Sequence, residues 1–139
     1  MDELRVSVEL ENYDDWSFVS HGWEPQLLVR RAVAEVLVAP ETSMLVLPRD
    51  LVDLLGLETT DRCMVEHADG KREEANLTTL VRLTVAGRTA EVPAIVMPNG
   101  AEPTLGQVPL SILDLHADYA TQRLMPRPES PHRPFVKLK

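Results

Sequence analysis

The sequence holds few of the residues that carry the commonest protein chemistries. Its single cysteine, Cys63, excludes an internal disulfide and a cysteine-based metal cluster. Aromatic residues make up only 4% of the 139 residues, so a core must be built mainly from Val, Leu, Ile and Ala. The six glycines stand apart, which excludes a glycine-rich phosphate loop, and the four histidines lack the spacing of a metal site. We therefore predict neither a cofactor nor a metal.

Positive charge is also scarce. Fourteen Lys and Arg face 22 Asp and Glu, which gives a net charge of −8 and a pI near 4.9. This balance opposes nucleic acid and anionic membranes as partners. The chain has no run of 18 apolar residues that would predict a membrane span, and residues 1–5 do not open a signal peptide. We expect a cytoplasmic protein.

The hydrophobic content of 44% supports one domain, and much of it alternates with polar residues as in half-buried strands. Strands are predicted over 4–10, 27–38, 77–85 and 88–96, with hairpins at Asp69-Gly70 and Ala86-Gly87. Helices are predicted over 49–55 and 107–115. The expected core is Val36, Val38, Leu45, Leu47, Leu55, Ile95, Leu105 and Ile112.

Two segments lack a regular pattern. Residues 11–23 are predicted to be irregular, and their large aromatics, Trp16, Phe18 and Trp23, either fasten a loop to the core or form a contact surface. After the domain, residues 127–139 form a proline-rich tail, and the prolines from Pro126 to Pro134 favour an extended polyproline-like backbone.

Two motifs carry a family resemblance. Leu45-Val46-Leu47-Pro48 precedes the first predicted helix, which ends in Leu55-Gly56-Leu57, and Leu105-Gly106 precedes the second. In this order and spacing they resemble the retropepsin-like aspartic proteases of bacteria. The resemblance implies a mainly β, retropepsin-like acid-protease barrel with two short helices over residues 1–126. It also implies a closing hairpin over 116–126.

The catalytic triplet of that family is missing. Counting back from Leu47-Pro48, the family's Asp-Thr-Gly falls on Ala39-Pro40-Glu41. Aspartic proteolysis needs two carboxylates about 3 Å apart that share one proton, and alanine supplies none. Glu41 is a candidate substitute, although two residues of extended chain place it about 6–7 Å from position 39. We therefore expect no catalytic residue.

The resemblance also implies a homodimer in which each chain supplies half of a peptide cleft. Ala39, Pro40, Glu41 and Thr42 would border that cleft, and a hairpin flap at His67, Ala68, Asp69, Gly70 and Lys71 would cover it. Three functions stay open: an inactive pseudoenzyme that binds an extended peptide or protein segment, an active aspartic endopeptidase that uses a displaced carboxylate such as Glu41, and a purely structural assembly subunit.

Overall fold

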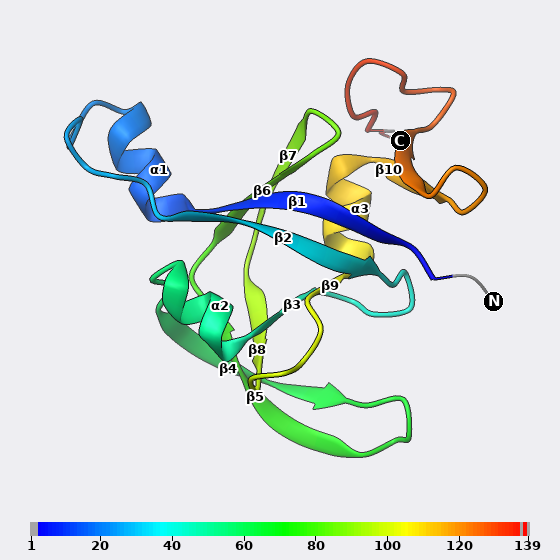
Figure 1. Cartoon of the computed structure of the whole chain (residues 1–139), viewed down its shortest axis with the longest axis horizontal. Helices are drawn as coiled ribbons and strands as arrows, with labels where there is room; N and C mark the ends of the chain where they lie inside the picture. Colours follow the sequence, from blue (N-terminus) through cyan, green and yellow to red (C-terminus); the bar gives the residue numbers. More distant parts are fainter. Residues whose placement is uncertain (1–2, 137, 139) are drawn as a thin grey trace.

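The computed structural model of the chain describes residues 3–136 and 138, and it is mainly β (Figure 1). A nine-stranded sheet curls into a half-barrel, and a two-stranded sheet forms separately. In chain order the described elements are β1 (Arg5–Asn12), α1 (Tyr13–Ser20), β2 (Arg31–Val38), β3 (Leu45–Pro48), α2 (Arg49–Leu54), β4 (Thr59–Glu66), β5 (Arg72–Thr78), β6 (Val81–Val85), β7 (Arg88–Val92), β8 (Ala94–Met97), β9 (Thr104–Leu105), α3 (Gln107–Leu113), β10 (Leu115–Asp118) and β11 (Arg123–Pro126). These helices have six to eight residues, and none of them could span a membrane.

The order of strands in the large sheet is β4-β5-β8-β3-β9-β2-β1-β6-β7. The short strand β9 lies between β2 and β3, parallel to the first and antiparallel to the second. Strands β2 and β3 are consecutive in the chain, but β9 holds them apart. The loop that joins them, residues 39–44, therefore has to pass around the end of β9.

The core is aliphatic, as the scarcity of aromatics predicts. Strand alternation supplies it: Val81, Leu83 and Val85 of β6 are buried, and the residues between them are half-buried. The predicted core residues Val36, Val38, Leu45, Leu47, Leu55 and Leu105 are confirmed as buried. Ile95 is only half-buried, and the prediction for Ile112 is wrong, because α3 turns Pro109, Leu110 and Leu113 inward and leaves Ile112 45% exposed.

Both predicted helices form, at Arg49–Leu54 and Gln107–Leu113. The second ends earlier than predicted, because Asp114 takes a left-handed conformation with a φ of 55° that closes the helix.

The prediction that residues 11–23 are irregular is wrong, since Tyr13–Ser20 form helix α1. The Asn12 side chain caps this helix by accepting a hydrogen bond from the Asp15 N–H at 3.0 Å, and Asp14 and Asp15 complement the dipole of its first turn. An asparagine followed closely by two acids is typical of the first residues of a helix. The sequence nevertheless did not predict α1, because the segment has no apolar stripe that would indicate a helical period.

All three predicted hairpins are present as β4–β5, β6–β7 and β10–β11. The observed strands differ in extent from the predicted ones: β1 spans Arg5–Asn12 rather than 4–10, and β2 begins at Arg31 rather than at residue 27. The strand predicted over 77–85 is divided between the end of β5 and β6, and the one predicted over 88–96 is divided by Pro93 into β7 and β8. Proline has no N–H to donate to a ladder, so it separates the two pairings.

The tail is not a straight polyproline segment. The Ser130 N–H donates to the Arg127 carbonyl at 2.9 Å, which makes a turn, and bends follow at 131–133. Asp114 holds the tail to the body by accepting a hydrogen bond from the Phe135 N–H at 2.9 Å and pairing with Arg127 at 2.7 Å. Local side-chain contacts therefore override the preference of the prolines.

Candidate functional site

The loop between β2 and β3 carries the positions where the resembled family has its acid. Ala39 is buried, and its N–H donates to the Leu105 carbonyl at 3.0 Å. The Thr42 N–H donates back to the Ala39 carbonyl at 2.9 Å, so residues 39–42 form a tight turn. Pro40 and Glu41 are exposed at the tip of this turn, and Thr42 is half-buried. The loop is thus ordered by its own backbone without any acid at position 39.

The same loop forms the seat of helix α3. The carbonyl of Thr42 accepts the Gln107 N–H at 2.7 Å, and that of Ser43 accepts the Val108 N–H at 2.8 Å. These bonds satisfy N–H groups that the first turn of a helix leaves unpaired. The Gly106 backbone lies so close to this loop that a Cβ at Gly106 would be 2.3 Å from the Met44 carbonyl oxygen and 2.5 Å from the Thr42 carbonyl oxygen. Only glycine fits this contact without moving the loop.

A row of half-buried side chains crosses the sheet on the face opposite the core. Its members are direct cross-strand neighbours from β5, β8, β3, β9 and β2, in the order Leu77, Ile95, Val46, Thr104 and Leu37. Directly paired residues point to the same face of a sheet. Their immediate sequence neighbours, among them Leu45, Val96 and Leu105, fill the core. We call these five residues the apolar row.

Sequence reasoning missed the apolar row, because strand alternation was used only to choose core residues. The signal was present in β3 and β8, where apolar residues occupy both faces. A strand with apolar residues on both faces needs a covering surface on its outer face as well as on its core face.

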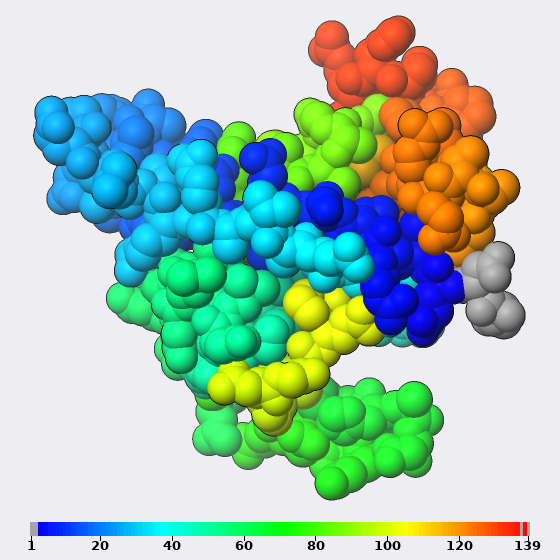
Figure 2. All heavy atoms as spheres, in the orientation of Figure 1, coloured from blue at the N-terminus to red at the C-terminus, as the bar shows by residue number. Residues whose placement is uncertain are grey.

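The β4–β5 hairpin extends the face of the apolar row beyond the body. Leu77 lies on β5, and farther along the same face Cys63 pairs with Ala75 and Val65 with Glu73. Both Cys63 and Val65 are half-buried, whereas Arg62 and Met64 on the opposite face are exposed. The hairpin and the 39–44 loop project toward the same side of the molecule in Figure 1, and Figure 2 shows open space between the green hairpin and the segments above it.

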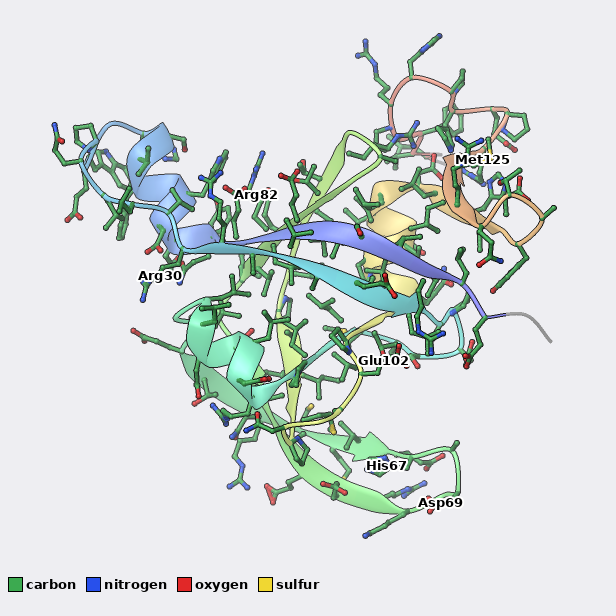
Figure 3. The ribbon with its side chains drawn as sticks, in the orientation of Figure 1. Arg30, His67, Asp69, Arg82, Glu102 and Met125 are labelled. Carbon is green, nitrogen blue, oxygen red and sulfur yellow. The ribbon has the colours of Figure 1, made fainter. Side chains whose placement is uncertain are left out.

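The tip of this hairpin holds the predicted flap residues His67, Ala68, Asp69, Gly70 and Lys71, and all five are exposed. Gly70 has a φ of 87°, which the turn requires, and the Lys71 N–H donates to Asp69 Oδ1 at 2.9 Å. Figure 3 shows His67 and Asp69 at this end of the hairpin. The ion pairs lie along the two strands rather than against the body: His67–Glu73 at 2.9 Å, Arg72–Glu66 at 2.8 Å and Arg62–Glu74 at 3.3 Å.

One carboxylate beside the apolar row, that of Glu102, forms an ion pair with Arg5. Glu102 receives two hydrogen bonds from the Arg5 guanidinium, one of them 3.1 Å from Nη2 to Oε1, and these lower the pKa of Glu102. Arg5 is the direct cross-strand partner of Leu37, which places this pair at the end of the row. A carboxylate held ionised in this way can position Arg5 but is unsuited to sharing a proton.

The other acids near the loop have structural roles. Asp50 Oδ1 accepts the Leu51 N–H at 2.9 Å in the first turn of α2, and Asp53 lies 3.8 Å from the Arg49 guanidinium. Glu41 is exposed at the loop tip. In the described part of the chain, no three His, Cys, Asp or Glu side chains gather closely enough to hold a metal ion.

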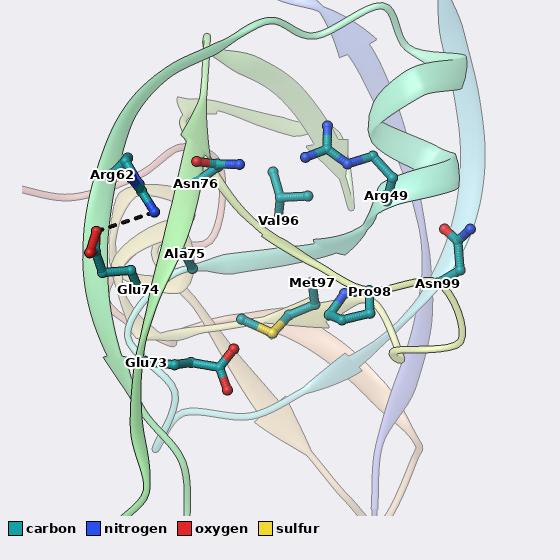
Figure 4. Close-up of a pocket in the computed structure, with 10 residues that line it drawn as sticks. All are labelled: Arg49, Arg62, Glu73, Glu74, Ala75, Asn76, Val96, Met97, Pro98 and Asn99. Atoms are coloured by element: carbon teal, nitrogen blue, oxygen red, sulfur yellow. Dashed lines mark ion pairs between the residues drawn. The ribbon is translucent and has the colours of Figure 1, made fainter.

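A pocket of about 400 Å³ lies at the base of the hairpin. It takes residues from both faces of the strands: Asn76 and Val96 alternate with row residues, whereas Glu73 and Ala75 lie on the face of Leu77. In Figure 4 Arg49 from α2 and Arg62 from β4 approach it from opposite walls. Its walls combine these two guanidinium groups with Glu73 and Glu74, so opposite charges balance around it.

A scan against protein-family models finds no match for this chain, and a search of curated proteins finds no relative. The function is therefore argued from the loop, the apolar row and the hairpin.

Proposed function

We propose that this chain is a retropepsin-like pseudoprotease, a homodimer that binds an extended peptide in a cleft and does not cut it. The observation that carries the proposal is the apolar row, an ordered strip of half-buried side chains beside a loop with no acid at position 39 and continuous with a projecting hairpin. Half-buried apolar side chains on an outer face gain free energy when a ligand covers them. A row drawn from five strands is rigid enough to define side-chain pockets for that ligand.

Peptide recognition has main-chain and side-chain parts. Strand β4 is the last strand at its end of the sheet, so one edge of its backbone is open to hydrogen bonding with an added strand. The apolar row crosses the strands, so a second segment of the ligand that passes over the sheet would place its apolar side chains on the row and on the adjoining Cys63 and Val65. An extended peptide with apolar residues at alternate positions suits both surfaces.

The absence of cleavage follows from chemistry at the loop. A dyad must accept a proton from water and donate one to the substrate carbonyl, and a methyl group at position 39 does neither. Glu41 stands at the exposed tip of a turn whose backbone is fixed by the Thr42–Ala39 hydrogen bond. Carrying its carboxylate to the position of the missing acid would require that turn to open.

The homodimer supplies the second wall. A single chain offers one loop, one row and one hairpin, and the loop and hairpin project on the same side (Figure 1). Two-fold pairing across that side would place two 39–44 loops face to face and enclose the ligand between two hairpins. This arrangement predicts that peptide binding and dimerisation strengthen each other.

The test of the proposal is peptide binding by row variants. A peptide array probed with the intact protein should give ligands with apolar residues at alternate positions, and Val46→Ser should weaken their binding about tenfold or more. The matched control is Val33→Ser, since Val33 lies on the same outer face but is 71% exposed on β2, away from the row. Equal binding by the two variants would contradict the assignment of the cleft.

The competing functions give different results in the same assays. An active endopeptidase would cut array peptides between about pH 4 and 7 and lose that activity in Glu41→Gln. A purely structural subunit would form a dimer in analytical ultracentrifugation but bind no array peptide. We expect binding without cleavage, and the same binding in Glu41→Gln.

A further inference from the structure

An aromatic lobe projects from the end of the molecule that carries α1. It comprises residues 13–30, which form α1 and the loop that follows, and it stands at the left of Figure 1. Trp23 is 67% exposed and Phe18 39% exposed, with their ring centroids 6.0 Å apart. The His21 ring stacks on Trp23 at 4.7 Å, and Leu28 is 87% exposed. These rings therefore pack on one another and not on the core.

The lobe is fastened to the body by polar groups. The buried Asp15 carboxylate accepts hydrogen bonds from Arg30 Nε at 2.8 Å, from Nη2 at 3.0 Å and from the Arg30 N–H at 3.0 Å. Asn12 Nδ2 donates to the Leu55 carbonyl at 2.9 Å, and Arg30 packs directly over Gly56. Because this anchor holds the lobe, the exposed aromatics are not needed to keep it in place. Exposed aromatics on an anchored projection are typical of contact surfaces.

The charge of the lobe restricts what can cover it. Residues 13–30 contain Asp14, Asp15 and Glu24, and Arg30 is their single lysine or arginine. Asp15 is engaged by Arg30, while Asp14 and Glu24 are exposed. Two lobes placed face to face would bring these carboxylates together without a counter-charge, which disfavours a symmetric lobe-to-lobe contact. The partner surface should combine apolar side chains with positive charge.

The tail of the same chain has that chemistry. Residues 127–139 contain Arg127, Arg133, Lys137 and Lys139 against the single Glu129. Arg133 is exposed, and the apolar side chains near it are open as well: Phe135 is 52% exposed and Val136 77%. The orange-red segment after Met125 lies at the upper right of Figure 1, at the other end of the molecule from α1. A tail that reaches a lobe therefore belongs to a different copy.

We propose that the aromatic lobe of one copy binds the tail of a second copy, in a head-to-tail contact. Phe135 and Val136 cover Trp23 and Phe18, and Arg133 meets the carboxylates of Asp14 and Glu24. The chain already shows one such pairing, because the Arg82 guanidinium lies 4.2 Å from the ring centroid of Trp16. Trp23 presents a second and more exposed indole to the Arg133 of another copy.

A head-to-tail contact is heterologous, so it leaves a lobe and a tail unused at the two ends of any assembly that does not close into a ring. It therefore adds copies in steps, whereas the two-fold pairing proposed for the cleft stops at two. The two contacts use different surfaces. Each can fail without the other, since neither the loop nor the hairpin belongs to the lobe or the tail.

The test is sedimentation velocity of full-length variants over a range of protein concentrations. Trp23→Ala and the double variant Arg133→Glu/Phe135→Ala should each weaken the stepwise association about tenfold or more. Leu54→Ala is the control, because Leu54 is 62% exposed on α2 outside both surfaces and should change nothing. Raising the salt concentration should weaken the wild-type association, because exposed charges contribute to it.

A mixing experiment distinguishes a head-to-tail contact from a symmetric contact between two lobes or two tails. The lobe variant retains an intact tail, and the tail variant retains an intact lobe, so an equimolar mixture should associate beyond either variant alone. A mixture that associates no further than its components would overturn the proposal. So would normal association of the tail variant, because the lobe would then have a different occupant.

Discussion

Replacing Gly106 by alanine tests whether the loop and helix α3 are one unit. The new methyl would lie 2.3 Å from the Met44 carbonyl oxygen, 2.5 Å from the Thr42 oxygen and 2.8 Å from the Met44 nitrogen. All three are backbone atoms, so no side-chain rotation relieves the contact. The φ of Gly106 is −94°, which alanine adopts freely, so the effect measures crowding and not backbone strain.

The magnitude follows from what must move. Reaching ordinary van der Waals contact requires the 42–44 backbone to shift by roughly 1 Å. Overpacking of this kind costs about 1–3 kcal/mol. The shift also weakens the hydrogen bonds from Gln107 to Thr42 and from Val108 to Ser43, each of which contributes about 1 kcal/mol. We expect Gly106→Ala to lower the free energy of unfolding by about 3–5 kcal/mol, a large share of the roughly 5–15 kcal/mol of a typical domain.

Urea unfolding followed by circular dichroism measures this loss. With an m-value of about 2 kcal/mol/M, the midpoint should fall by roughly 2 M. Gly87→Ala is the matched control: a Cβ at Gly87 meets nothing within 4 Å, but its φ of 76° strains alanine, so a cost of about 1–2 kcal/mol is expected. The reasoning fails if Gly106→Ala is no less stable than Gly87→Ala.

Two further predictions concern buried carboxylates. Hydrogen bonding from the Phe135 N–H, together with Arg127, lowers the pKa of Asp114 from 3.8 to about 2, so its contribution is complete above pH 3.8 and is lost as the pH falls toward about 2. The protection of the Phe135 amide, measured as its exchange rate relative to that of an unprotected amide at the same pH, should fall over that pH range, while in Asp114→Asn it should not change with pH. Asp15→Asn should lower stability by about 1.5–3 kcal/mol, because it removes charge-assisted hydrogen bonds to Arg30. The exposed neighbour Asp14→Asn should stay within about 0.5 kcal/mol of wild type, and equal melting temperatures for the two variants would show that the Asp15–Arg30 pair does not hold the lobe.

The parts of the fold that sequence predicted are those governed by local rules. Alternating residues such as Val81, Leu83 and Val85 identify strands, and Asp69-Gly70 and Ala86-Gly87 identify hairpins, because both signals need only a few neighbouring residues. Helix α1 escaped detection, because its segment has no apolar stripe with a helical period and its position depends on the distant Arg30. Ile112 was misplaced because a leucine stripe fixes the buried face only to within one residue.

The candidate site likewise has a part that the sequence predicts and a part that it does not. That position 39 carries no acid can be read directly from the sequence, and the resemblance that draws attention to this position needs only its spacing to Leu47-Pro48. The apolar row cannot, because its order comes from pairings such as Leu77–Ile95 and Leu37–Thr104 that join residues far apart in the chain. Its residues were each recognisable as strand residues, but their common face depends on a register that only tertiary structure defines.

The position of β9 between β2 and β3 has a consequence for the order of folding. The 39–44 loop is fixed by bonds to Leu105, Gln107 and Val108, more than sixty positions later in the chain. Closing so large a loop costs entropy before the bonds form, and folds rich in such contacts form slowly. During synthesis β2 and β3 emerge first, with a gap where β9 belongs. Until residues 104–108 arrive, both flanking edges stay open, which makes this interval the time of greatest exposure to misassociation with other nascent chains.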